Sequence, residues 1–162
     1  MAIVRPMEPR DIGPVLALME DMAERSEKLG SPFFDTVSTN RQNGFVETLK
    51  GSMDNPEHSL LLVGEHKGEI VAALVAHLCR NYPYAKSQTD VFVPALWFRD
   101  KVNPIVAGRI LVSGIKQLRE FSQNKGAGTI FGNTYHADER ARKLMRRMNF
   151  RATYIRYEVE VN

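Results

Sequence analysis

Two apolar segments separated by a short polar turn are the feature that most constrains the fold of this chain. Residues 59–65 are dense in leucine and valine, and residues 70–78 continue with mostly apolar side chains. Between them stands His66-Lys67-Gly68-Glu69, a sequence typical of a tight turn. Apolar runs joined by a glycine-containing turn predict a β-hairpin, around which the other elements must be arranged.

The remaining segments alternate between strand and helix patterns. Apolar residues recur at helical spacing after Asp11, which is suited to cap a helix. In the segment 89–102, Pro94 interrupts a strand pattern and predicts an edge strand or a bulge. The expected strands are 2–5, 59–65, 70–78, 89–102, 129–134 and 154–161, and the expected helices are 11–29, 40–52, 105–125 and 138–148. The predicted order is therefore β-α-α-β-β-β-α-β-α-β, an α/β (α+β) fold in one domain over residues 1–162.

Composition narrows the class of protein. A chain of 162 residues with 43% hydrophobic and 25% charged residues can bury a core and is not typical of disorder. Cys79 is the only cysteine, so no intrachain disulfide is expected. Neither an apolar run near the ~20 residues of a membrane span nor a signal-peptide pattern is present, so we expect a cytoplasmic location without membrane attachment. The net charge of +3 suits an anionic ligand without requiring nucleic acid.

The segment Val102-Asn103-Pro104-Ile105-Val106-Ala107-Gly108-Arg109-Ile110-Leu111-Val112 carries the first motif. It resembles the V-x-P, two residues, R-G-x-G-x-G/A pattern that opens the long helix of the GNAT acetyltransferases. Val102, Pro104 and Gly108 match in register. Ala107 replaces the arginine, and Ile110 and Val112 replace two small residues.

A second motif lies near the end of the chain. Asp138-Glu139-Arg140-Ala141, followed by Met145 and by Asn149-Phe150, is similar to the family pattern N-x-x-A, tyrosine, G-F. Asn149 is a reasonable substitute for glycine because asparagine tolerates a left-handed backbone. Asp138 replaces the asparagine, and Met145 replaces the tyrosine.

The resemblance covers nearly the whole chain and implies a GNAT-like mixed central sheet flanked by helices. It implies acetyl-CoA as co-substrate, with its pyrophosphate at a helix N-terminus, where unpaired N–H groups and the helix dipole favour an anion. Ile110 and Val112 would crowd that position unless they turn inward, and Arg109 could replace the lost positive charge or remain solvated. The coenzyme-binding residues that the resemblance implies are Lys101, Val102, Asn103, Ala107, Gly108, Arg109, Ile110, Asp138 and Ala141.

The family reaction is direct attack of an amine on the thioester, with the tyrosine protonating the departing thiolate. Met145 has no proton to give. Tyr135 and His136 precede the helix that bears it and are the candidate catalytic residues, His136 also as a base. The alternative is that Tyr135 packs in the core and His136 is a surface residue. The acceptor amine is not identified; Phe33, Phe34, Tyr82 and Tyr84 are candidates to line its pocket, or they pack their loops onto the core.

Two functions remain open at this point: an N-acetyltransferase, and a catalytically inactive GNAT-like domain that binds a protein partner or serves in an assembly. Scattered histidines and one cysteine argue against a metal site. Six basic residues between Arg140 and Arg151 suit phosphates, an acidic protein or a solvated face. Without interleaved aromatic residues they do not favour nucleic acid. The oligomeric state is not predicted.

Overall fold

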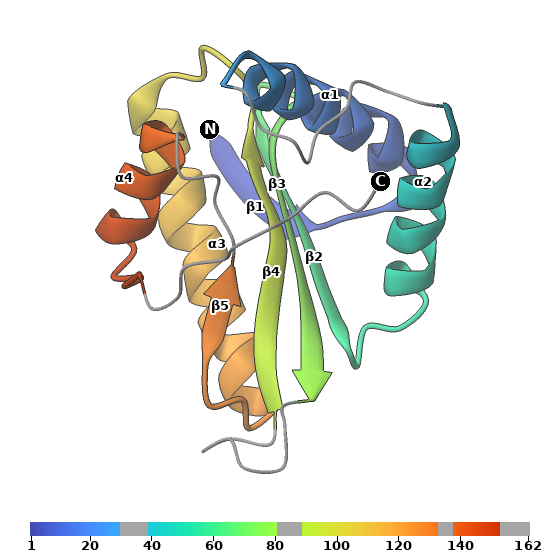
Figure 1. Ribbon diagram of the computed structural model, residues 1–162, viewed down its shortest axis with the longest axis vertical. Helices are drawn as coiled ribbons and strands as arrows, with labels where there is room; N and C mark the ends of the chain where they lie inside the picture. The colour runs from blue at the N-terminus through green and yellow to red at the C-terminus, as the bar shows by residue number, and fades with distance from the viewer. Residues whose placement is uncertain (30–38, 81–88, 133–137, 153–162) are drawn as a thin grey trace, which may run out of the picture.

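The hairpin at 59–80 forms the centre of the sheet. The computed structural model describes residues 1–29, 39–80, 89–132 and 138–152, and the elements follow the predicted order (Figure 1). A 3-10 turn at Pro9–Asp11 precedes the first helix. The elements are β1 (Ala2–Pro6), α1 (Ile12–Lys28), α2 (Thr39–Met53), β2 (Ser59–His66), β3 (Glu69–Arg80), β4 (Thr89–Phe98), α3 (Pro104–Asn124), β5 (Ile130–Gly132) and α4 (Glu139–Arg147). The expected strand at 154–161 lies outside the described residues.

The turn between β2 and β3 has the geometry that its sequence predicts. His66 pairs with Glu69, and the two residues between them, Lys67 and Gly68, have φ angles of 54° and 81°. Positive φ at both central positions is the arrangement that matches the twist of a two-residue hairpin. The predicted hairpin is therefore confirmed.

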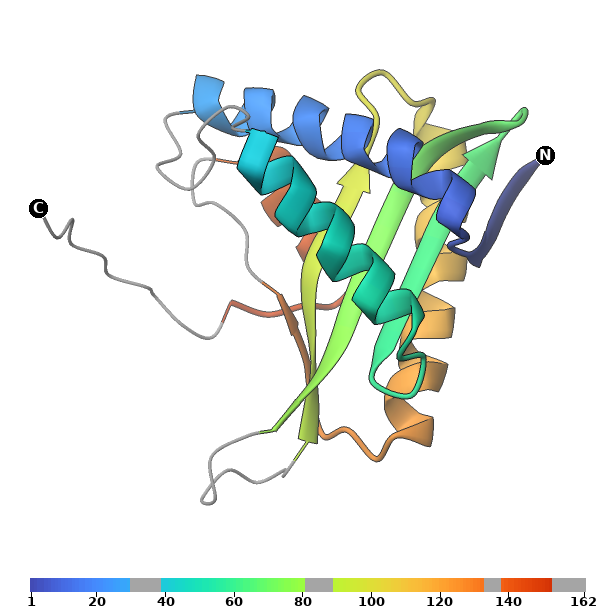
Figure 2. The same ribbon diagram turned by 90° about the vertical axis from the view of Figure 1, so that its right-hand side faces the viewer.

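Strands β1 to β4 are antiparallel neighbours in chain order, and β5 joins β4 in parallel. Helices α1 and α2 cover one face of the sheet, where Val15, Leu18 and Leu49 pack against Val63. Helix α3 covers the opposite face, where Leu118 packs on the sheet (Figures 1 and 2). The mixed, three-layered arrangement agrees with the predicted fold class.

Pro94 lies in a β-bulge. His77 of β3 pairs with Phe92 and Val75 pairs with Ala95, so two residues of β4, Val93 and Pro94, stand opposite one residue of β3. Proline has no N–H to donate to the ladder, which explains its place at an irregularity. The predicted interruption is confirmed, and the strand ends at Phe98, four residues before the expected boundary.

Both helix ends that the sequence indicates are built alike. Gly126 after α3 and Asn149 after α4 have φ angles of 65° and 62°. The next residue in each case donates its N–H five residues back, Ala127 to Ser122 at 2.9 Å and Phe150 to Met145 at 3.0 Å. This is the Schellman arrangement, which satisfies carbonyls at a helix end.

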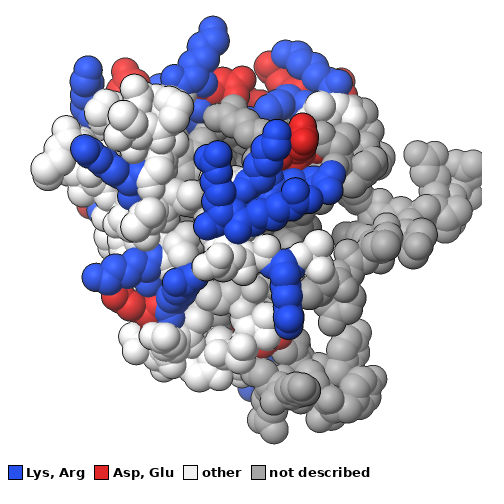
Figure 3. Space-filling model, turned by 90° about the vertical axis from the view of Figure 1, so that its left-hand side faces the viewer, with Lys and Arg blue, Asp and Glu red and all other residues white. Residues whose placement is uncertain are grey.

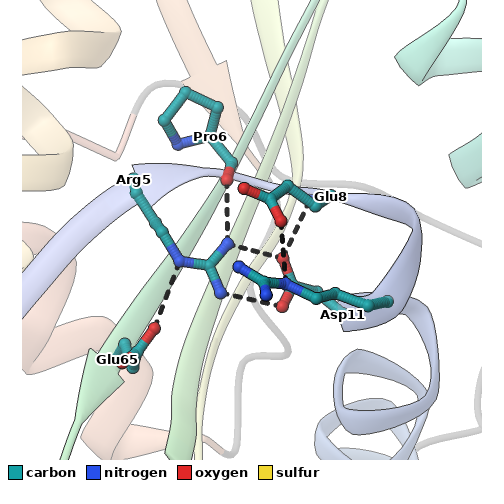
Figure 4. A network of polar contacts seen from close by, with 6 residues as sticks. Arg5, Pro6, Glu8, Asp11 and Glu65 are labelled. Carbon is teal, nitrogen blue, oxygen red and sulfur yellow. Dashed lines mark hydrogen bonds and ion pairs between the residues drawn. The ribbon is translucent and has the colours of Figure 1, made fainter. Parts of the chain in front are cut away.

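An ion-pair network joins β1 to the start of α1 (Figure 4). Arg5 donates to both carboxylate oxygens of Asp11, at 2.7 and 2.9 Å, and to Glu65 of β2 at 3.2 Å. The backbone N–H of Glu8 also donates to Asp11, at 2.8 Å. The hydrogen bond from Arg5 lowers the pKa of Asp11, so the buried carboxylate stays charged and ties the first helix to the sheet.

Helix α3 approaches β2 closely at Gly64. A side-chain carbon at Gly64 would lie 2.5 Å from Cγ2 of Ile110 and 3.0 Å from Cβ of Ala72. We therefore predict that Gly64→Ala destabilises the protein by about 1–3 kcal/mol through overpacking. Chemical denaturation measures the change. Gly51→Ala, on the exposed side of α2 with no atom in reach, should be neutral or stabilising by up to about 1 kcal/mol. In an Ile110→Ala background the cost of Gly64→Ala should fall, and an unchanged cost would show that this contact is not the cause.

The Asp11 pair should make stability depend on acid pH. Since the pKa of Asp11 is lower in the folded state, the pair stabilises the fold above the pKa of an unfolded aspartate, about 3.9. That contribution is lost as the pH falls through the lower folded value. We predict that Asp11→Asn costs about 1–3 kcal/mol at neutral pH and flattens the fall in stability toward acid. Urea unfolding of both proteins across this range measures it, and parallel curves would contradict the assignment.

Candidate functional site

Beyond the bulge, one edge of β4 carries backbone donors that no described strand takes up. Pairing with β5 covers only Val91 to Val93. The N–H of Arg99 donates to Val71 of β3 at 2.9 Å. Because alternate residues of an antiparallel strand direct their N–H groups to opposite edges, the N–H groups of Leu96 and Phe98 point away from β3. They are positioned to hold a carbonyl oxygen beside this edge.

A connection of five residues separates β4 from helix α3, and the first turn of the helix is capped by the protein's own groups. The side chain of Asn103 accepts a hydrogen bond from the N–H of Ile105 at 2.9 Å. The carbonyl of Asn103 accepts one from Ala107, also at 2.9 Å. The helix expected at 105–125 is confirmed and begins one residue earlier, at Pro104, a residue suited to the first helical position because it lacks an N–H.

The two bulky replacements in the motif do not block the start of α3. Ile110 faces the sheet at 5% exposure, in a cluster with Val71 and Ala72. Val112 points outward and is 72% exposed. Val102 and Val106 pack against the same cluster as Ile110 and anchor the first turn to the sheet. The inward orientation of Ile110 thus resolves the crowding that its size suggested.

The polar residues at the start of α3 are accessible. Lys101, Asn103, Gly108 and Arg109 are exposed, and Lys101 has a φ of 64° in the connection from β4. No atom lies within 4 Å of a side-chain carbon built on Gly108. Lys101 and Arg109 therefore offer positive charge to an anion at the start of the helix.

Met145 lies beside the last described pair of β4 and β5, Val93 and Gly132. A side-chain carbon on Gly132, the last described residue of β5, would stand 3.3 Å from Cε of Met145 and 3.0 Å from the carbonyl oxygen of Val93. The side chain of Met145 is half-buried. The position that corresponds to the acid in the motif is thus held by α4 against the end of the β4–β5 pairing.

Comparison with known proteins rests on structure alone. No family model matches the chain, and no curated protein matches it by sequence. A mutant of the BH1408 protein from Bacillus halodurans matches with 18% identity over 99% of each chain and a TM-score of 0.79. The aminoglycoside antibiotic 6'-N-acetyltransferase AAC(6')-Ih from Acinetobacter baumannii matches with 12% identity over 100% of this chain and 99% of its own, TM-score 0.71. A predicted acetyltransferase with acetyl-CoA from Clostridium acetobutylicum gives 10% identity over 99% and 96%, TM-score 0.71.

The chain has the GNAT fold. At these identities the likeness establishes the architecture, and the chemistry must be argued from the residues of this chain.

In this GNAT fold, Asp138 is engaged by a residue that the sequence did not single out. Arg25 of α1 lies 3.8 Å from Asp138 through Nε, and its Nη1 donates to Asp100 at 3.3 Å. The carbonyl of Asp138 accepts from the N–H of Arg142 at 3.0 Å and begins α4. Arg25 thus connects α1 to the end of β4 and to the helix that bears Met145. Its position in an amphipathic helix gave no signal for this role.

Several candidate residues lie outside the described part of the chain. These are Tyr135 and His136, the candidate catalytic residues, and the aromatic residues Phe33, Phe34, Tyr82 and Tyr84. Ala141 belongs to α4, but its side chain is not described. Their roles stay predictions.

His77 and Cys79 do not form a reactive pair. His77 lies 3.1 Å from the hydroxyl of Ser59, and the Cys79 thiol donates to the carbonyl of Asp90 at 3.5 Å. Burial lowers the pKa of His77 and raises the pKa of Cys79, so the thiol is held in its less nucleophilic form. Among the described residues no group of three or more His, Cys, Asp or Glu is arranged to hold a metal. No helix in the same ranges is long and apolar enough to cross a membrane.

Proposed function

We propose that this protein transfers an acetyl group from acetyl-CoA to an amine. The observation that carries the proposal is the donor edge of β4 at Leu96 and Phe98, which a connection of five residues links to the accessible start of α3. A thioester carbonyl beside β4 would accept hydrogen bonds from these N–H groups. The phosphates of the coenzyme would then reach Lys101 and Arg109. The solved GNAT-fold acetyltransferases support the proposal by analogy.

The reaction would proceed by direct attack. The amine nitrogen forms a bond to the acetyl carbon as the carbon–sulfur bond breaks, the amine loses a proton, and the thiolate gains one. Negative charge that develops on the carbonyl oxygen is stabilised by the β4 donors. Tyr135 and His136 remain the candidates for moving the protons. A thiol with a pKa of about 8.5 is also a fair leaving group without help.

Two observations favour a second candidate function, a binding or assembly domain without catalysis. The side chain of Asn103 already accepts the hydrogen bond that the N–H of Ile105 donates. A diphosphate would have to compete with this side chain for the N–H group. Met145 supplies no proton at the junction of β4 and β5.

Calorimetric titration with acetyl-CoA separates the two. We predict micromolar binding, and Arg109→Glu should weaken it by about tenfold, equivalent to about 1.4 kcal/mol, because the charge at the start of α3 is reversed. Lys50→Glu, an exposed reversal on α2, is the matched control and should bind as the wild type does. No heat and no thermal shift at millimolar acetyl-CoA would leave only the binding function.

Restoring the acid gives a gain-of-function test. We predict that Met145→Tyr raises the rate of thiol release with a general amine acceptor above that of Met145→Phe, which has the same ring without a hydroxyl. A positioned acid contributes roughly 10²–10⁴-fold, and a newly introduced one should reach the lower end of that range. Steady-state thiol release measures it. Equal rates in the two variants would mean that this position does not face the leaving group.

A further inference from the structure

A groove of about 530 Å³ runs between α3 and the end of α4. Leu111, Val112 and Ile115 of α3 form its apolar side, and the polar part of its lining includes Lys116, Arg119 and Arg147. Val112, at 72% exposure, is among the most exposed large apolar side chains described. The positions of Val112, Lys116 and Arg119 follow one stripe of the helix, three to four residues apart.

Positive charge is concentrated on this face. Residues 139–151 hold six basic residues against one acidic residue, an excess larger than the chain's net charge of +3, so the rest of the chain is net negative. Figure 3 shows Lys and Arg side chains gathered over this side of the molecule. The acidic groups Glu120 and Glu139 pair with Lys116 and Lys143, at 3.8 and 3.4 Å. The arginines that line and flank the groove therefore dominate its electrostatic potential.

Most of the groove lies further along α3 than the proposed coenzyme site, and its near end, at Leu111 and Val112, adjoins Arg109. Lys116 is twelve residues along α3 from Pro104, which corresponds to about 18 Å at the rise of an α-helix. Arg147 and Asn149, at the C-terminal end of α4, form the other wall. A diphosphate at the start of α3 would therefore lie away from the part of the groove at Lys116 and Arg119.

We propose that the α3–α4 groove binds an acidic, amphipathic helical segment of a partner protein. Apolar side chains of such a segment would cover Leu111, Val112 and Ile115, while its carboxylates would meet Arg119 and Arg147. Among the described residues of the lining none is aromatic, so this part of the surface lacks the stacking platforms that bind single-stranded nucleic acid. The apolar side chains of the groove also make no favourable contact with the phosphate backbone of a nucleic acid. This inference holds whether or not the protein transfers acetyl groups.

The test uses the full chain and a labelled synthetic peptide of about 18 residues, roughly five helical turns. The peptide carries leucine at positions i, i+3, i+4 and i+7 and glutamate on its opposite face. A scrambled peptide of the same composition and an oligonucleotide of equal charge serve as controls. Fluorescence anisotropy should show that the patterned peptide binds with micromolar affinity. Both controls should bind about tenfold or more weakly than the patterned peptide.

Variants locate the binding surface. The double variant Arg119→Glu/Arg147→Glu should bind the patterned peptide about tenfold or more weakly than the wild type does. The single variant Val112→Asp should weaken binding by a similar factor. Since all three side chains are exposed, these changes should leave the fold intact, which circular dichroism checks. Lys50→Glu, a reversal on the other side of the sheet, should leave the peptide affinity unchanged.

Four results would overturn the proposal. Equal affinity for the patterned and scrambled peptides would mean that the groove attracts any acidic peptide by its charge alone. Tighter binding of the oligonucleotide would mean that the groove binds nucleic acid. Displacement of the peptide by acetyl-CoA would make the groove part of the coenzyme site. A dimer in sedimentation that Val112→Asp dissociates would mean that a second copy of the chain covers the groove.

Discussion

The bulge in β4 is the constraint on which the candidate site depends. Here the bulge at Val93 and Pro94 inserts one extra residue and reverses which N–H groups face which edge. The same strand therefore pairs with β5 before the bulge and presents the amides of Leu96 and Phe98 after it. A single irregularity thus leaves an edge of β4 whose N–H groups no described strand takes up, and the proposed function assigns this edge to a thioester carbonyl.

Helix α3 occupies its position because of a matched pair of a small and a large residue. Gly64 leaves the sheet surface bare, and Ile110 fills that space. In the resemblance, Ile110 counted as a loss, since it stands where a small residue would let the backbone approach an anion. In the structure the same side chain faces away from the mouth of the helix and stabilises its packing. The replacement changes how α3 is anchored and leaves Arg109 and Gly108 accessible.

Most of the fold could be predicted from the sequence because its signals are local. The turn at Lys67-Gly68, the break at Pro94 and the helix ends at Gly126 and Asn149 each act within a few residues, and the structure confirms them. The start of α3, expected at residue 105, lies at Pro104, where Asn103 caps the helix. The ion pairs of Arg25 could not be predicted from the sequence. Its partners Asp100 and Asp138 are distant along the chain and come close to Arg25 only in the folded protein. The donor edge of β4 consists of main-chain amides, which leave no residue-type signature.

The uneven distribution of charge has a consequence for how this molecule meets others. Helix α4 holds five basic residues and one acidic residue, an excess larger than the net charge of +3 of the whole chain, so positive charge is concentrated at this helix. In a field from an anionic surface or protein the molecule would rotate before contact and present this helix first. At physiological ionic strength the effect extends over about 8 Å, so the orientation is set in the last step of diffusion.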